Sequence, residues 1–229
     1  SETRRTGGEG GYKMIWVKIC GIRTLEEAKA VRLAGAAAYG QVFAPSPRMI
    51  SPEDAARINH SVQGGILKVG VFVNAALETV KQVARECKLD IIQLHGHEPR
   101  EYVAELNYPV IKAFSVQYPI TPYDLQGWKA WAFLLDAYSP GRRGGTGQVI
   151  APDLLEFLGN FDNIILAGGL RPGNVARAIR LYRPMGVDVS SGVEYPRGGK
   201  DPAAINMFMQ EVREACEMHP EPRQVVEYW

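Results

Sequence analysis

The sequence has no excess of charge of either sign and no long apolar run. Its 229 residues carry 26 Lys and Arg against 25 Asp and Glu, a formal net charge of +1. A protein that binds nucleic acid usually shows a basic excess or a basic face, so we predict no nucleic-acid partner. No apolar stretch approaches the ~18 residues that cross a bilayer, so we predict no membrane partner either.

Cysteine and histidine are also scarce. The three cysteines, Cys20, Cys87 and Cys216, are odd in number, lie far apart and form no C-x-x-C pair. This pattern is typical of a reducing compartment, and we expect a cytoplasmic location. Only four histidines are present, so His95 and His97 would lack imidazole partners on other strands, and we predict no metal site.

The length and composition indicate one globular domain. With 46% hydrophobic and 22% charged residues, a chain of this size can bury roughly 70% of its unfolded surface without a disulfide or metal. Residues 1–13 are glycine-rich and polar, and we interpret them as a disordered tail or a cloning remnant. We expect the catalytic domain over residues 14–215 and a C-terminal extension over residues 216–229.

Eight short apolar runs alternate with amphipathic stretches, and their starts are about 20 to 32 residues apart, the length of a strand–helix unit. The predicted strands are Ile15–Cys20, Ala37–Phe43, Leu67–Val73, Ile91–His95, Val110–Phe114, Ala132–Asp136, Ile164–Ala167 and Val187–Val189. Helix starts lie between them. Thr24 and Glu27 form a capping box, and Ser51-Pro52 and Asp201-Pro202 place a capping residue before a proline.

Polar residues at the C-terminal ends of these strands favour a closed barrel over an open sheet. With a period of two, Lys18 shares a face with Cys20, Gln93 with His95, and Asp188 with Ser190. Such groups need one wet place to converge, which a barrel mouth supplies, whereas an open sheet collects ligand groups from a few strands. We therefore predict a single-domain α/β fold, a (β/α)₈ TIM barrel. Its mouth would be lined by Lys18, Gln93, His95 and Asp188.

Two residues at strand ends are candidates for proton transfer. Cys20 ends the first strand, where a thiol is well placed to react, although most free cysteines are small buried hydrophobes. Asp136 ends the apolar run from Ala132 to Leu135, and a carboxylate there is costly to bury unless it is paired or functional. A helix cap or a loop salt bridge is the alternative for Asp136, but a long loop follows it.

Two basic residues carry open alternatives. Arg48 follows Pro45 and Pro47, which stiffen its loop, so its guanidinium suits a carboxylate or a phosphate. A solvated arginine against the following helix is the other interpretation. Lys18 would either lower the pKa of Cys20 by its charge or form a structural ion pair inside the barrel.

Three loops of small residues follow the last three predicted strands. Glycine lets backbone N–H groups approach an anion, and barrels frequently bind phosphate after strands seven and eight. Each loop alone also fits an ordinary turn. Together they predict a phosphorylated small-molecule ligand, bound through Gly144, Gly145, Thr146, Gly147, Gly168, Gly169, Ser190, Ser191 and Gly192.

Taken together, these segments resemble the phosphoribosylanthranilate isomerase family. The matching stretches are VKICGI (17–22), PSPR (45–48), VGVFVN (69–74), QLHGHE (93–98), LLDA (134–137), GGTG (144–147), LAGGLRPGNV (166–175), and DVSSGVE with GKD (188–194, 199–201). They run in order from about Val17 to Glu211. In combination they are highly specific.

The resemblance implies a (β/α)₈ barrel and an activity in tryptophan biosynthesis. The family rearranges N-(5-phosphoribosyl)anthranilate to the carboxyphenylamino-deoxyribulose phosphate, an Amadori rearrangement. Cys20 then matches the general base, Asp136 the general acid, and Arg48 the residue that meets the anthranilate carboxylate. The glycine loops match the phosphate site, and no metal or organic cofactor is implied. We expect a monomer or a homodimer.

Two stretches depart from the family pattern. The second strand carries Tyr39 and Gln41, which we expect to change barrel packing or the anthranilate pocket. After GGTG, Ile150-Ala151-Pro152 stands where the family often has an aromatic segment. We expect this difference to affect loop closure and the fit of the substrate.

Two other functions compete with this one. A sugar isomerase of histidine biosynthesis, or a dual enzyme of both pathways, resembles a barrel with aspartate where Cys20 stands. A non-catalytic barrel that binds a phosphorylated metabolite would not need both Cys20 and Asp136.

Overall fold

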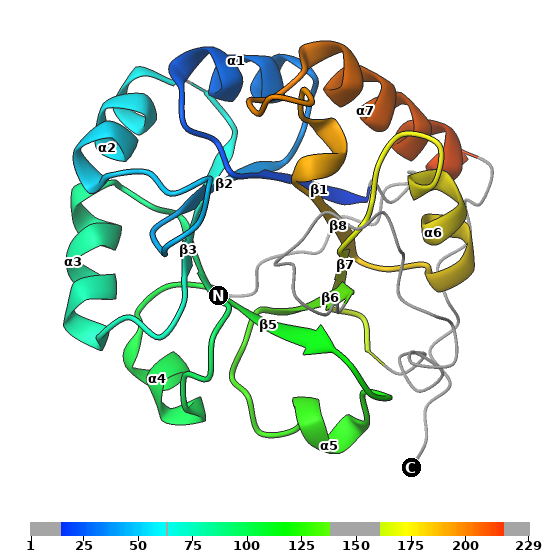
Figure 1. Ribbon diagram of the computed structural model, residues 1–229. Helices are drawn as coiled ribbons and strands as arrows, with labels where there is room; N and C mark the ends of the chain where they lie inside the picture. The colour runs from blue at the N-terminus through cyan, green and yellow to red at the C-terminus, as the bar shows by residue number, and fades with distance from the viewer. Residues whose placement is uncertain (1–14, 63, 138–160, 218–229) are drawn as a thin grey trace, which may run out of the picture.

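A computed structural model describes residues 15–62, 64–137 and 161–217 (Figure 1). Three of the sequence-derived predictions lie outside these residues or nearly so. They are the tail at 1–13, the segment from the Gly144–Gly147 loop through Ile150-Ala151-Pro152, and the extension at 216–229 beyond Glu217. The described residues contain all eight predicted strands.

The eight strands are parallel and close into a barrel in chain order, with β1 pairing β8 (Figure 1). The predicted barrel is therefore confirmed. The strands are β1 (Trp16–Cys20), β2 (Ala38–Val42), β3 (Leu67–Phe72), β4 (Ile91–Leu94), β5 (Val110–Val116), β6 (Ala132–Ala137), β7 (Ile164–Ala167) and β8 (Gly186–Val189). The differences from the predicted runs are at the strand ends, where pairing with a neighbour decides the boundary.

The helices surround the barrel and cover its outer face (Figure 1). They are α1 (Leu25–Leu33), α2 (Pro52–Ser61), α3 (Leu77–Glu86), α4 (Arg100–Glu105), α5 (Pro122–Leu125), α6 (Val175–Tyr182) and α7 (Pro202–Glu217), with a 3-10 turn η2 (Ser191–Val193). The capping box at Thr24 and the Ser51 cap before Pro52 are both present. The last helix begins at Pro202, as predicted, and ends two residues beyond residue 215.

Alternation along the strands builds two cores. Residues that point into the barrel form a small apolar cluster of Ala38, Val69, Ile91, Ile111, Ala113, Ala132, Leu134, Ile165 and Ala167. Residues that point outward pack against the helices in a larger cluster, which includes Val17, Ile19 and Leu135. Because inward residues near the N-terminal ends are apolar, the polar inward residues collect at the other end of the barrel.

Of the two effects expected for Tyr39 and Gln41, the structure supports the one on barrel packing. Their strand neighbours Ala38 and Gly40 lie beside the inward residues Lys18 and Cys20, so Tyr39 and Gln41 face the helices. The buried Tyr39 hydroxyl donates a hydrogen bond to Asn59 Oδ1 in α2 at 2.7 Å. The departure therefore concerns packing between sheet and helices.

Candidate active site

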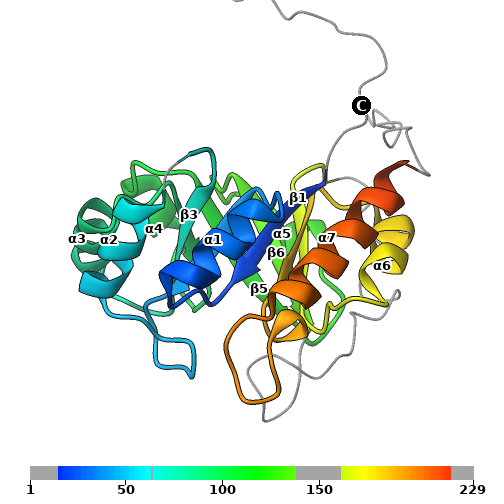
Figure 2. The same ribbon diagram turned by 90° about the horizontal axis from the view of Figure 1, so that it is seen from above.

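The C-terminal ends of the strands open onto one side of the barrel, and the candidate residues lie there. Figure 2 shows the loop after β2 and the loop after β8 projecting from the same edge. The register places Lys18 beside Asp188 on β8 and Cys20 beside Gly40 on β2.

Lys18 forms a buried ion pair inside the barrel. Its Nζ lies 2.8 Å from Asp188 Oδ1, and its side chain is fully buried. Gly40 leaves room for this arrangement, because a Cβ at Gly40 would lie 2.8 Å from Cys20 Sγ and 3.1 Å from Lys18 Nζ. The Lys18 ammonium and the Cys20 thiol therefore both lie against Gly40.

Cys20 is a thiol in the resting protein. Burial raises its pKa above the ordinary 9.0, and Asp188 adds to the rise, while Lys18 and Lys200 oppose it without overcoming it. Of the two alternatives for Lys18, the structural ion pair is present. The effect of its charge on Cys20 is also present, although the net shift is upward because burial dominates.

Asp136 is a carboxyl group without a close cation among the described residues. Burial raises its pKa to about 6, with help from Asp188 and against the pull of Lys18. Gly168, predicted as a phosphate ligand, lies against this residue. A Cβ at Gly168 would lie 2.6 Å from Asp136 Oδ1, and its φ is +81°, so only glycine fits here without strain.

His95 lies next to Asp136. Its Nε2 is 3.6 Å from Asp136 Oδ2, and its Nδ1 is 3.2 Å from the side-chain amide of Gln93. Burial lowers the pKa of His95 to about 4, so the imidazole is neutral at pH 7. The contact with Asp136 is then between a carboxyl and an uncharged ring, which leaves the carboxyl pKa high. His97 is exposed.

A buried ion pair on the outer side of the barrel anchors the loop that carries His95. Glu98 and Lys112 lie 2.7 Å apart with side chains 2% and 3% exposed. Lys112 also donates to the carbonyl of Gly96, and Glu98 accepts from the backbone N–H of Asn74 and Gly96. These contacts join the loops after β3 and β4 to β5 and fix where His95 stands.

Arg48 comes to the mouth from the loop after β2 and meets Glu194, which follows η2. Nε and Nη2 of Arg48 donate to Oε1 and Oε2 of Glu194, each at 2.7 Å. Lys200 donates to the same carboxylate at 2.7 Å. These bonds hold the pKa of Glu194 at about 2, well below its ordinary value. Arg48 is therefore paired within the protein, not solvated.

The loops after β7 and β8 lie against each other. A Cβ at Gly192 would overlap the carbonyl oxygen of Leu170, so this contact requires glycine. Asn174 supports the first loop by donating to the carbonyl of Gly169, and Ser190 Oγ donates to the carbonyl of Cys20. Gly168, Gly169, Ser190, Ser191 and Gly192 are thus gathered beside Asp136 and Cys20.

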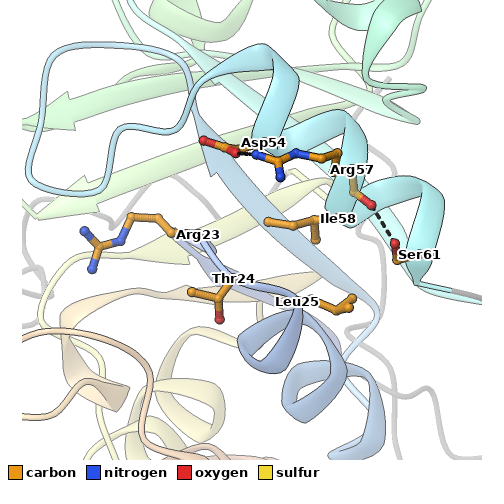
Figure 3. Close-up of a pocket in the computed structure, with 7 residues that line it drawn as sticks. All are labelled: Arg23, Thr24, Leu25, Asp54, Arg57, Ile58 and Ser61. Carbon is orange, nitrogen blue, oxygen red and sulfur yellow. Dashed lines mark hydrogen bonds and ion pairs between the residues drawn. The ribbon is translucent and has the colours of Figure 1, made fainter.

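A separate cavity of about 260 Å³ lies outside the barrel, between the start of α1 and α2 (Figure 3). Arg23, Thr24 and Leu25 form one wall, and α2 residues such as Arg57 and Ser61 form the other. Arg57 pairs with Asp54 in the same helix. None of the mouth residues lines this cavity, so it is not the candidate site.

Two negative findings apply to the described residues alone. In residues 15–62, 64–137 and 161–217, no group of three or more His, Cys, Asp or Glu is placed to hold a metal ion. No helix in that same part of the chain has the length and apolar character to span a membrane.

The roles of Glu194 and Lys200 were not predicted from the sequence. Both stand in the motif stretches DVSSGVE and GKD, so the signal was present. Their pairing with Arg48 could not be seen, because Arg48 and Glu194 are 146 residues apart in the chain. The ion pair of Glu98 and Lys112, 14 residues apart, was missed because it depends on the pairing of β4 with β5.

Comparison with known proteins gives consistent matches over the barrel. A family described as N-(5'phosphoribosyl)anthranilate (PRA) isomerase matches residues 17–211. An N-(5'-phosphoribosyl)anthranilate isomerase from Syntrophomonas wolfei is 52% identical over 201 residues, covering 88% of this chain and 98% of that protein. This is the same span over which the motifs occur.

Solved structures agree. A phosphoribosyl anthranilate isomerase from Thermotoga maritima superposes with a TM-score of 0.80 at 40% identity, covering 88% of this chain and all of that chain. Another isomerase of that name, in complex with reduced 1-(o-carboxyphenylamino)-1-deoxyribulose 5-phosphate, has a TM-score of 0.75 at 38% identity. It covers 88% of this chain and 100% of that one.

Proposed function

The chain belongs to the N-(5'-phosphoribosyl)anthranilate isomerase family, and we propose that Cys20 and Asp136 perform the two proton transfers of its reaction. The activity is an aldose–ketose isomerisation in tryptophan biosynthesis. The substrate, N-(5'-phosphoribosyl)anthranilate, loses its furanose ring and becomes a 1-amino-1-deoxyketose. The residues that move the protons are the finer part of the proposal.

The placement of Asp136 at the end of β6, beside His95 and where burial raises its pKa to about 6, carries this proposal. Opening the furanose requires a proton on the ring oxygen, and a carboxylic acid with a pKa near the working pH is an effective donor. Asp136 gives this proton as the C1'–O bond breaks, and the anilino nitrogen supplies the electron pair that forms the Schiff base. The carboxylate that remains can take a proton back in a later turnover step.

Cys20 takes the second proton. The protonated Schiff base acidifies the C2' proton, and a thiolate removes it to give an enolamine. The enolamine becomes the ketone as C1' gains a proton and the C2' hydroxyl loses one, which restores the proton count of Asp136 and Cys20. Lys18 beside the sulfur stabilises the thiolate. Because the ordinary states are a carboxylate and a thiol, the reactive form, acid with thiolate, is a minor form of the same net charge.

The two groups come from strands that flank the mouth. In the ring of strands, β7 and β8 separate β6 from β1. Electrostatic coupling of Asp188 to both Cys20 and Asp136 supports their sharing one site. A sugar held between them would be reached from two sides, which is what transfer at the ring oxygen and at C2' requires.

The remaining predicted contacts concern binding. We assign the substrate phosphate to the loops with Gly168, Gly169 and Ser190–Gly192, together with the predicted Gly144–Gly147 loop. We assign the anthranilate carboxylate to Arg48. A positively charged guanidinium in a stiff loop, and glycines that expose backbone N–H groups, support these assignments. No metal or organic cofactor is needed for either proton transfer. Oligomeric state and cellular location stay predictions.

A turnover assay with two substrates tests the proposed function. Purified protein should convert N-(5'-phosphoribosyl)anthranilate and should leave the larger two-phosphate substrate of histidine biosynthesis unchanged. Turnover of both would indicate a dual enzyme, and turnover of neither would indicate a non-catalytic barrel. Cys216→Ala is a matched control for variants of Cys20, because both cysteines are 8% exposed and Cys216 lies in the outer core.

A further inference from the structure

The guanidinium of Arg48 is bound along one edge only. Glu194 accepts from Nε and Nη2. A guanidinium carries five N–H donors in a planar fork, so the edge formed by Nη1 and the second hydrogen of Nη2 is left by this pairing. No further hydrogen bond of this group is found in the described part of the chain. That edge has the spacing to bind a second carboxylate through two hydrogen bonds.

The stem of Arg48 is held against the backbone next to Cys20. Gly21 has a φ of +87°, and a Cβ there would lie 2.5 Å from Arg48 Cδ. The loop itself is tied down, since Arg48 N–H donates to Ser46 Oγ and Arg23 Nη1 donates to the carbonyl of Pro47. We call the edge formed by Nε and Nη2, which Glu194 binds, the inner edge, and the edge formed by Nη1 and Nη2 the outer edge. Because the stem and the loop are held, the group that binds the inner edge decides the direction of the guanidinium.

Lys200 adds a positive charge to the pair of Arg48 and Glu194. Its side chain is 1% exposed, and its Nζ donates to Glu194 at 2.7 Å and to the carbonyl of Ser190. An arginine and a glutamate alone would have no net charge. With Lys200 the cluster has one positive charge in excess, so it attracts an anion although Arg48 already has a carboxylate partner.

We propose that Glu194 is a positioning residue, which binds the inner edge of Arg48 and so directs the outer edge toward the carboxylate on the aromatic ring of the substrate. This inference rests on the proposed function, in which Arg48 meets that carboxylate. Glu194 touches no substrate atom. It selects a ligand with a carboxylate by fixing the plane of the guanidinium. Lys200 contributes to this selection by giving the cluster its net positive charge.

Two stable ligands test this inference without catalysis. One is the reduced product analogue that carries the carboxyphenyl group, and the other is the same compound without the carboxylate. Calorimetry gives Kd for both. Glu194→Gln should weaken binding of the carboxylated ligand about tenfold, as expected for one well-aligned bond between charged groups, and should change the other ligand by less than about twofold. Glu78→Gln, an exposed glutamate on α3, is the matched control and should change neither.

The outcomes separate this inference from the proposed function. Arg48→Gln should show the same selectivity for the carboxylated ligand. If Arg48→Gln weakened both ligands equally, the assignment of Arg48 in the proposed function would be wrong. If Arg48→Gln were selective but Glu194→Gln weakened both ligands equally, or tightened the carboxylated one, the positioning role of Glu194 would be wrong.

A paired variant guards against misfolding. Glu194→Gln alone leaves the Lys200 ammonium buried without its anion, which is costly. The double variant Glu194→Gln with Lys200→Met removes both charges and leaves the charge of Arg48 unchanged. The positioning role predicts that the tenfold selective loss persists in the double variant, with KM raised and kcat little changed. Recovery of wild-type affinity in the double variant would contradict it.

Discussion

The two sides of the barrel mouth shift the pKa of a carboxyl group in opposite directions. On the side of β8, β1 and β2, Glu194 binds Arg48 and Lys200, and its pKa is about 2. On the side of β6, Asp136 faces a neutral His95, and its pKa is about 6. The Asp136 side chain is 23% exposed and that of Glu194 is 13% exposed, so exposure does not explain the difference.

The difference shows that cations, not burial, decide the state of each carboxyl. Burial raises both pKa values, and only Glu194 has cations close enough to reverse the effect. Among the described residues, Lys18 is the cation that lowers the pKa of Asp136, and its ammonium is already paired with Asp188. The side with Arg48, Glu194 and Lys200 is therefore suited to bind an anion. The side with Asp136 is suited to donate and accept a proton.

The largest effect is expected from removing the base. Cys20→Ala should lower kcat by about 10²–10⁴-fold, because a positioned proton-transfer group contributes this much, while KM changes far less. Steady-state kinetics with Cys216→Ala as the control measures it. A Cys20→Ala enzyme with nearly unchanged kcat would remove Cys20 from the mechanism.

Lys18→Met should destabilise the barrel by about 3–5 kcal/mol, because it leaves the Asp188 carboxylate buried without its cation. The loss of Lys18 should also raise the pKa of Asp136, since Lys18 lowers it in the wild type. Urea denaturation measures the first effect. A loss below about 1 kcal/mol would mean that the pair of Lys18 and Asp188 is dispensable for the fold.

The two carboxyls should affect stability with opposite signs. The native pKa of Asp136 exceeds its unfolded value of 3.8, so its ionisation opposes folding above about pH 6 and has no effect below about pH 4. Asp136→Asn should then stabilise the protein by about 2–3 kcal/mol at pH 7 and by nearly nothing at pH 4. The pKa of Glu194 is depressed, so its stabilising effect is present above about 4.5 and lost as the pH falls toward 2.

Thermal denaturation between pH 3 and pH 8 measures both effects. Glu194→Gln should lower Tm at pH 7, and its difference from wild type should shrink as the pH approaches 3. Asp136→Asn should raise Tm at pH 7. If both variants shifted Tm in the same direction at pH 7, the contrast between the two sides of the mouth would be wrong.

A smaller effect is expected outside the mouth. Tyr39→Phe removes the donor to Asn59 Oδ1 and should cost about 1 kcal/mol of stability. Because Tyr39 faces the helices, the pH dependence of kcat should match that of the wild type. A changed pH profile in Tyr39→Phe would show that the second strand influences the mouth after all.

The sequence was sufficient for the barrel and for most of the mouth because both depend on local patterns. Strands of period two, helix caps at Thr24 and Ser51, and polar residues at strand ends are each visible within a few residues. Contacts between distant loops are not. Glu194 with Arg48, and Glu98 with Lys112, depend on strand order and register, and the fit of Gly168 against Asp136 depends on the distance between β6 and β7.

Two variants assayed on a substrate analogue whose sugar is already open separate the roles of Asp136 and Cys20. If Asp136 serves ring opening and Cys20 takes the C2' proton, the opened analogue bypasses only the step of Asp136. We predict that Asp136→Asn recovers part of its lost rate on the opened analogue, whereas Cys20→Ala recovers none. Equal failure of both variants on the opened analogue would contradict a dedicated role of Asp136 as the acid for ring opening.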